Sequence, residues 1–163
     1  MKKISILLMI AGIFALISCE KDQVMTKINS LTPSSITSPA SGNSYILTEI
    51  EENNVMETFT WSAADFGYQS ATTYTIQIDK AGNNFATPIN AGETNLTEAD
   101  ITVGEMNNFL LSNGALPNVE VSYDVRVIAT VHADVETLVS SIIEMKITPF
   151  EKVIIYPTVY LPC

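Results

Sequence analysis

The sequence predicts an all-β fold, an antiparallel β-sandwich with one short crossover helix. Three observations predict it. Four segments alternate apolar and polar residues with the period of a half-buried strand, turn-forming residues separate these segments, and a single segment shows helical spacing. The chain has 163 residues, which is enough for one domain with a substantial core.

Each predicted strand gathers its apolar residues on one face. The apolar faces are Phe59, Trp61 and Ala63 in residues 56–63; Tyr74, Ile76 and Ile78 in 73–79, with Asp79 on the polar face; Val121, Tyr123, Val125, Val127, Ala129 and Val131 in 121–131; and Val139, Ser141, Ile143, Met145 and Ile147 in 137–148. Such alternation is typical of strands that bury one side.

One segment breaks this alternation. Apolar residues and one asparagine recur there at helical spacing, and Gly114 follows as a stop signal. We therefore expect a crossover helix over residues 102–112, with an inner face formed by Val103, Met106, Asn107 and Leu110. The polar residues 20–44 are rich in Ser, Thr and Pro, and they predict a tether that becomes a first edge strand near Ile36.

The N-terminus has the features of a secretory signal peptide. Lys2 and Lys3 precede an apolar run over residues 4–17, whose 14 residues are fewer than the roughly 20 that cross a bilayer as a helix. We therefore expect residues 1–18 to be a lipoprotein signal peptide. A buried N-terminal helix is the alternative.

Cys19 stands where that signal ends. The series Leu16-Ile17-Ser18-Cys19 resembles the lipobox of bacterial lipoproteins, in which the thiol forms a thioether to diacylglycerol. Two or more acyl chains give stable anchoring where one chain gives only marginal binding. We expect Cys19 to carry a covalent lipid and expect no other cofactor; a disulfide, a metal ligand and a core thiol are the alternatives.

The charge of the chain limits the kinds of partner that it can bind. The formal net charge of -10 argues against nucleic acid, because nothing could neutralise a run of phosphates. Glu20-Lys21-Asp22 resembles the acidic tag that accompanies export of Bacteroidetes lipoproteins to the outer face of the outer membrane.

Residues with catalytic or metal-binding chemistry are sparse. His132 is the only histidine and has no nucleophile partner, so a surface position is expected. Residues 79–84 partly match a calcium loop, but Ala81 and Asn84 occupy positions that need a ligand and a glycine, which favours a strand-end turn. Glu49, Glu51 and Glu52 predict a solvated acidic loop. We expect no metal site and no enzyme.

Two details narrow the kind of sandwich. Residues 123–129 resemble the penultimate strand of immunoglobulin/fibronectin III-like domains, in which Tyr123 would make a tyrosine-corner contact. Trp61 is expected in the core, and a sugar-stacking platform is the alternative for it.

Several segments together carry a family resemblance. The series "SPASGNSYILT", "TFTWSAADFGYQSATTYTIQIDKAGNNFATP", "EMNNFLLSNG", "YDVRVIATV" and "ITPF" resembles the N-terminal domain of SusE-type outer membrane lipoproteins, which belong to starch- and glycan-utilisation systems of Bacteroidetes. The resemblance covers residues 15–163. It implies a lipidated tether over 19–33, an immunoglobulin-like domain over 34–150, and over 151–163 a linker and the start of a truncated starch-binding module.

The resemblance also implies a function. The immunoglobulin-like domain would be a non-catalytic spacer that displays glycan-binding modules, anchored through Cys19 in the outer membrane and exposed at the cell surface, beside a porin/SusD-like receptor complex. Residues 156–163 look like the opening of such a module, except that relatives have Gly where this chain has Cys163, and no glycan-binding residue can be carried over. The alternatives are carbohydrate binding by the domain itself, through Tyr45, Tyr68 or Phe66, and a fibronectin III-type adhesion module.

Overall fold

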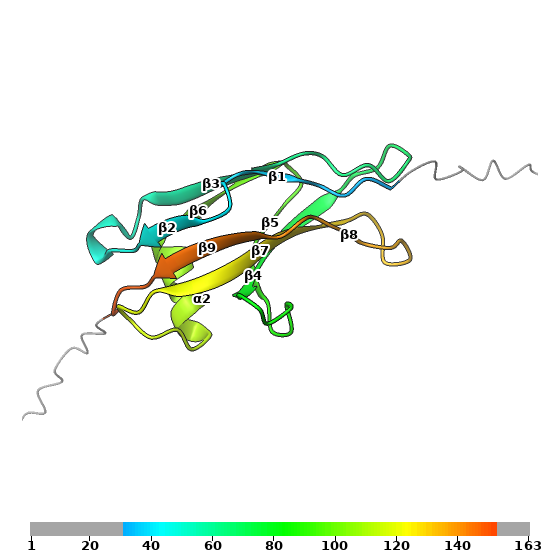
Figure 1. Cartoon of the computed structure of the whole chain (residues 1–163). Helices are drawn as coiled ribbons and strands as arrows, with labels where there is room; N and C mark the ends of the chain where they lie inside the picture. Colours follow the sequence, from blue (N-terminus) through cyan, green and yellow to red (C-terminus); the bar gives the residue numbers. More distant parts are fainter. Residues whose placement is uncertain (1–30, 153–163) are drawn as a thin grey trace, which may run out of the picture.

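Two β-sheets packed face to face form the molecule in the computed structural model, which describes residues 31–152 (Figure 1). The smaller sheet has the order β1-β3-β6, formed by β1 (Ile36–Ser38), β3 (Val55–Trp61) and β6 (Glu98–Thr102). The larger sheet has the order β2-β9-β7-β4-β5, formed by β2 (Asn43–Ile46), β9 (Ile143–Thr148), β7 (Val121–Thr130), β4 (Thr73–Lys80) and β5 (Ile89–Thr94), with β8 (Leu138–Val139) paired to β7.

The predicted all-β sandwich is confirmed, and its strand order is immunoglobulin-like. The chain changes sheets on both flanks, between β1 and β2 and between β5 and β6. The first edge strand lies where the sequence predicted it, around Ile36. One pair departs from the expected antiparallel arrangement, because β2 runs parallel to β9.

This parallel pair places the two ends of the described chain far apart. The first strands run in the same direction as the last strand, so the chain enters at one end of the sandwich and leaves at the other (Figure 1). Leu31 lies at the entry end and Lys152 at the exit end.

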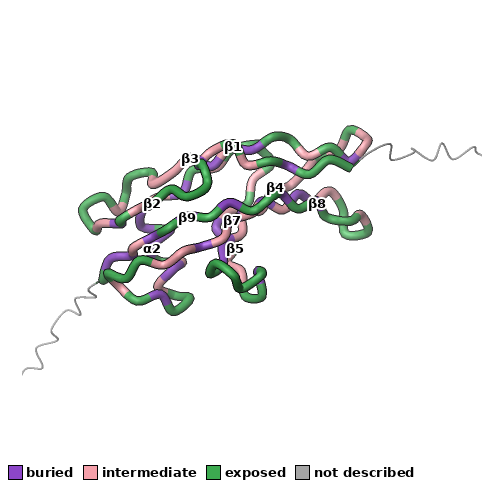
Figure 2. Tube along the Cα trace, viewed as in Figure 1, coloured by how far each residue is buried: buried purple, intermediate pink, exposed green. Residues whose placement is uncertain are grey.

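The core fills the space between the sheets. Buried positions alternate with more exposed ones along the strands (Figure 2), as the period of two requires. The inward faces predicted for β4 and β7 are confirmed, since Ile76, Ile78, Val125, Val127 and Ala129 are all at most 1% exposed. Trp61 packs in the same layer against the Tyr74 ring, with the ring centroids 5.6 Å apart.

The face predicted for residues 137–148 is correct only in its second half. Ile128 pairs with Val139 and Val125 pairs with Ile143, so residues 126–127 lie opposite the three residues 140–142. The extra residue is a β-bulge, and it reverses which side chains point inward. Val139 and Ser141 are therefore exposed, contrary to the prediction, whereas Leu138 and Ser140 are buried.

The Ser140 side chain replaces backbone hydrogen bonds that the bulge interrupts. Its hydroxyl accepts a 2.9 Å hydrogen bond from the Val127 amide and donates a 2.8 Å bond to the Ser141 carbonyl.

The prediction also extended the apolar face of β3 too far. Because β3 ends at Trp61, Ala63 lies beyond the strand and is exposed.

The crossover helix α2 (Val103–Ser112) agrees with the predicted 102–112 to within one residue. Thr102 and Glu105 form a capping box, in which the Thr102 hydroxyl accepts from the Glu105 amide and the Glu105 carboxylate accepts from the Thr102 amide. The Thr102 amide and, second, the Thr102 hydroxyl donate hydrogen bonds to the Glu105 carboxylate and lower the pKa of Glu105. The helix ends before Gly114, whose φ of 81° is the left-handed conformation that glycine adopts most easily.

Asn107 joins α2 to the end of the last strand. Its side chain is 0% exposed, its amide nitrogen donates a 3.2 Å bond to the Phe150 carbonyl, and its amide oxygen accepts a 2.8 Å bond from the Phe150 amide. Both backbone groups of Phe150 are thus satisfied by one buried side chain. The helical pattern predicted that Asn107 faces inward, but not that it binds this residue.

We expect Asn107→Ala to lower the free energy of unfolding by roughly 2–4 kcal/mol, because it leaves two buried backbone groups without partners. Asn108→Ala is the matched control, since Asn108 is the exposed neighbour on the same helix and should change stability by less than about 0.5 kcal/mol. Urea denaturation of both variants measures the difference. Equal stabilities for the two variants would contradict the structural role of the Asn107–Phe150 bonds.

Candidate functional site

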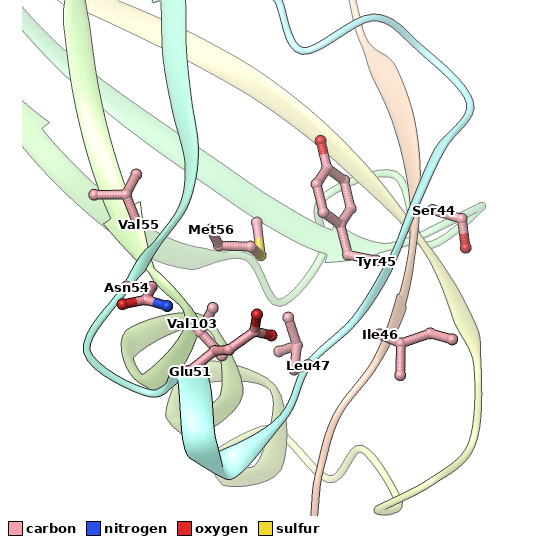
Figure 3. Close-up of a pocket in the computed structure, with 9 residues that line it drawn as sticks. All are labelled: Ser44, Tyr45, Ile46, Leu47, Glu51, Asn54, Val55, Met56 and Val103. Carbon is pink, nitrogen blue, oxygen red and sulfur yellow. The ribbon is translucent and has the colours of Figure 1, made fainter.

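A groove of about 350 Å³ opens on the flank of the sandwich between β2 and β3 (Figure 3). Tyr45, Leu47, Met56 and Val103 point into it, and Glu51 and Asn54 lie at its end. The complete lining is Ser44, Tyr45, Ile46, Leu47, Glu51, Asn54, Val55, Met56 and Val103. The groove therefore combines apolar side chains with polar groups, and its exposed lining is more polar than apolar.

The groove exists because the first strand changes sheets. β1 pairs with β3 only at Thr60 and Trp61, and the chain then crosses to the other sheet, where β2 pairs with β9. The first half of β3 is left with a strand neighbour on the β6 side alone. β2 is the edge of its own sheet, so two strand edges face each other across the opening.

Tyr45 is held in place across this opening. Its hydroxyl donates a 2.6 Å bond to the Glu57 carboxylate and accepts a 3.2 Å bond from the Asn43 side-chain nitrogen. Burial, together with the hydrogen bond to Glu57 and its negative charge, raises the pKa of Tyr45 to about 12. The ring is thus a fixed, neutral side chain at physiological pH, and it is partly exposed in the lining of the groove.

Residues 49–52, three of which are glutamates, form the 3-10 helix η2 (Glu49–Glu51) and the residue after it. Glu49 and Glu51 are exposed, as the prediction of a solvated loop requires. Glu52 differs, because its carboxylate makes a 2.6 Å ion pair with Lys152 and its carbonyl accepts a 2.9 Å bond from the Gly104 amide. It therefore connects η2 to both α2 and the end of the chain that the structure describes.

The aromatic residues proposed for carbohydrate binding have different positions. Phe66 is 1% exposed, so its prediction as an exposed platform is wrong. Trp61 is 4% exposed, which confirms the core position and overturns the sugar-stacking alternative. Tyr45 and Tyr68 are half-buried, and of these two only Tyr45 lines the groove.

Residues 79–84 form the predicted strand-end turn between β4 and β5. Asp79 is buried, contrary to the prediction that it lies on the polar face. Its carboxylate holds the turn together, because it accepts hydrogen bonds from the Lys80 and Thr87 amides and from the Asn83 side chain. Burial alone would raise the pKa of Asp79, but these hydrogen bonds outweigh it and lower the pKa. The carboxylate is thus committed to the turn.

Other predicted residues contribute little chemistry. His132 is exposed and lies 3.4 Å from the Asp134 carboxylate, which agrees with the predicted surface position. Tyr123 is in the core, where burial raises its pKa, but no hydrogen bond of its hydroxyl is found within residues 31–152. The predicted tyrosine corner is therefore not observed in this part of the chain.

The described part of the chain contains no cluster of three or more His, Cys, Asp or Glu side chains that could hold a metal ion. Between residues 31 and 152, no helix is long and apolar enough to cross a membrane. The groove itself carries one carboxylate, Glu51, among its lining residues.

Three predictions lie outside the described residues. These are the signal peptide over 1–18, lipidation of Cys19 with the acidic tag after it, and the module start that ends in Cys163. Sequence reasoning also missed the groove and the Asn107 contact. Only the Thr-x-x-Glu series of the capping box, residues 102–105, could have been recognised from spacing alone.

Fold and site together define a β-sandwich module of immunoglobulin-like topology with a groove between β2 and β3. The sequence matches the profile of the SusE outer membrane protein family over residues 20–128, and the chain belongs to this family. No curated protein matches the chain. Membership places it in the outer membrane, associates it with the Sus complex, and assigns it to surface binding and accessory proteins not known for catalysis.

Proposed function

We propose that this chain is a non-catalytic spacer, a surface lipoprotein module that displays glycan-binding modules at the outer membrane. The observation that carries the proposal is the parallel pairing of β2 with β9, which sends the chain in at one end of the sandwich and out at the other. A domain with both termini at one end would add little distance between the membrane anchor and the displayed modules. This arrangement adds the full length of the sandwich.

The length and the construction of the sandwich support this role. β7 has ten residues, which corresponds to about 30 Å of extended strand. It is paired on both sides, with β4 and with β8 and β9, so the long axis is built into a continuous sheet. A sheet held in this way transmits position from one end to the other better than a flexible linker of similar length.

The anchor and the partners complete the proposal. Cys19 would hold the module in the outer membrane through its lipid, residues 19–33 would be the tether, and Glu20-Lys21-Asp22 would direct it to the cell surface. The displayed modules would follow this chain, and starch is the glycan that the resemblance suggests. A porin and SusD-like receptor pair is the protein partner that fits this position.

A second candidate function is carbohydrate binding by the domain itself. The observation that favours it is the groove, whose lining the fixed Tyr45 ring shares with Glu51 and Asn54. Aromatic faces and polar groups of these types are what sugars bind. Tyr45 is the residue on which this candidate depends.

Cys19→Ala is expected to abolish incorporation of labelled fatty acid in cells, because the thiol is the acceptor of the lipid. Cys163→Ala is the matched control and should be labelled as strongly as the unchanged chain. Labelling is measured on the immunoprecipitated protein. Fatty acid on the Cys19→Ala variant would contradict the lipid anchor.

Calorimetric titration of residues 20–163 with maltooligosaccharides separates the two candidate functions. The spacer proposal predicts no heat of binding, for the unchanged chain and for Tyr45→Ala alike. Binding that disappears in Tyr45→Ala but persists in Tyr68→Ala would establish the groove as a sugar site and contradict a pure spacer. Sequencing the reading frame beyond codon 163 tests directly whether glycan-binding modules follow.

A further inference from the structure

The strand β2 has an unpaired main-chain edge on the side of the groove. In the larger sheet it pairs with β9 alone. The Leu47 amide, directly after β2, donates a 2.9 Å hydrogen bond to the Thr148 carbonyl on the β9 side. Because successive amides of a strand point to opposite sides, those of Ser44 and Ile46 point away from β9, toward the groove. Within residues 31–152, no strand pairs with β2 on that side.

This edge lacks the features that usually prevent pairing with another chain. Edge strands of native proteins are commonly protected by charged side chains, by proline or by a bulge. β2 reads Asn-Ser-Tyr-Ile, and its register with β9 is unbroken. The groove beside it is also preformed, because the Glu57 carboxylate holds the Tyr45 hydroxyl. A fixed side chain loses little conformational freedom when a partner binds.

Apolar side chains lie on both sides of the opening between β2 and β3. Tyr45, Leu47 and Met56 point into the groove, whereas Ile46 and Val55 point away from it (Figure 3). Ile46 is 74% exposed and Val55 is 50% exposed, and all five residues belong to the lining of the same groove. The side chains of an extended segment alternate between its two faces. Such a segment in the opening would therefore meet apolar side chains with both faces.

The charge at the end of the groove favours a cationic occupant. Glu51 lies there and is exposed, and Glu49 is exposed on the same 3-10 helix. Within residues 31–152 neither carboxylate forms an ion pair, and no lysine or arginine belongs to the groove lining. A second copy of this chain, with a net charge of -10, would bring further negative charge. A segment that carries lysine or arginine would instead complement the two glutamates.

We propose that the groove binds an extended segment of a partner protein, which pairs its main chain with the edge of β2 and places a lysine or arginine near Glu51. This mode of binding is β-strand addition. It goes beyond the spacer proposal, because it gives the spacer a protein contact of its own. The separation of the two ends does not depend on it, so it can fail while the spacer proposal stands.

A short labelled peptide, in which valine and threonine alternate between two terminal lysines, is the probe. Fluorescence anisotropy measures its binding to the full chain, purified in mild detergent. We expect saturable binding that weakens about tenfold or more when glutamates replace the terminal lysines. Methylation of alternate peptide nitrogens should abolish binding, because methylated nitrogens cannot donate to the strand edge. In saturating peptide, the Ser44 and Ile46 amides should exchange about tenfold more slowly by NMR.

The double variant Ile46→Ser, Val55→Ser should weaken binding of the lysine peptide about tenfold, because both side chains would contact the added strand. Both are exposed, so the sandwich should remain folded, which the exchange of β7 amides checks. Leu96→Ser, Val139→Ser is the matched control, since it removes two exposed apolar side chains outside the groove lining and should leave binding unchanged.

Four results would overturn the proposal. The first two are no binding of the lysine peptide to the unchanged chain, and equal binding of the methylated peptide. The third is displacement of the lysine peptide by maltooligosaccharides, which would assign the groove to a sugar. The fourth is protection of the β2 amides that grows with protein concentration when no peptide is present, which would assign the edge to a second copy.

Discussion

The parallel pairing of β2 with β9 is the constraint on which the rest of this structure depends. In a sheet built only from hairpins, each strand runs opposite to the one before it. The number of strands then decides whether the first and last strands run in the same direction. Here the first strand crosses between the sheets, and its continuation lies along the last strand in the same direction. The opposite placement of the two ends and the groove beside β3 both follow from this crossing.

The same crossing explains why the polar groups lie where they do. A strand that leaves its sheet exposes backbone edges, and the edges of β2 and β3 face a groove lined by Tyr45, whose hydroxyl is held by the Glu57 carboxylate. At the exit end, the backbone beyond β9 has no strand to pair with, and Asn107 and Asn118 satisfy it instead. Buried backbone groups that lack a strand partner need such substitutes.

Much of the fold could be predicted because strands and helices that bury one face repeat their apolar residues at a fixed spacing in the sequence. The alternation in β4 and β7 and the helical spacing of α2 identified the core residues, since each side chain meets the core at a period set by its own backbone. The bulge at Ser140 was missed because one inserted residue reverses the alternation without changing composition. Asp79 was misplaced because its hydrogen-bond partners in the turn compensate its burial, and alternation cannot show that.

The site was less predictable for a related reason. The groove is formed by segments paired through the sheet crossing, and Asn107 meets Phe150 across 43 residues, so neither has a signature in local spacing. Phe66 was predicted to be exposed under the carbohydrate-binding alternative, yet the fold buries it. Family membership supplies the location in the outer membrane, which no residue within the sandwich encodes.

The distance between the two ends of the sandwich tests the central claim most directly. Spin labels at Thr32→Cys and Glu151→Cys, with Cys19 and Cys163 replaced by serine, report it by pulsed electron resonance. A spacer that carries the chain from end to end predicts one narrow distance of about 30 Å or more. A distance below about 20 Å, or a broad distribution, would show that the ends are not held apart along the strands and would contradict the account.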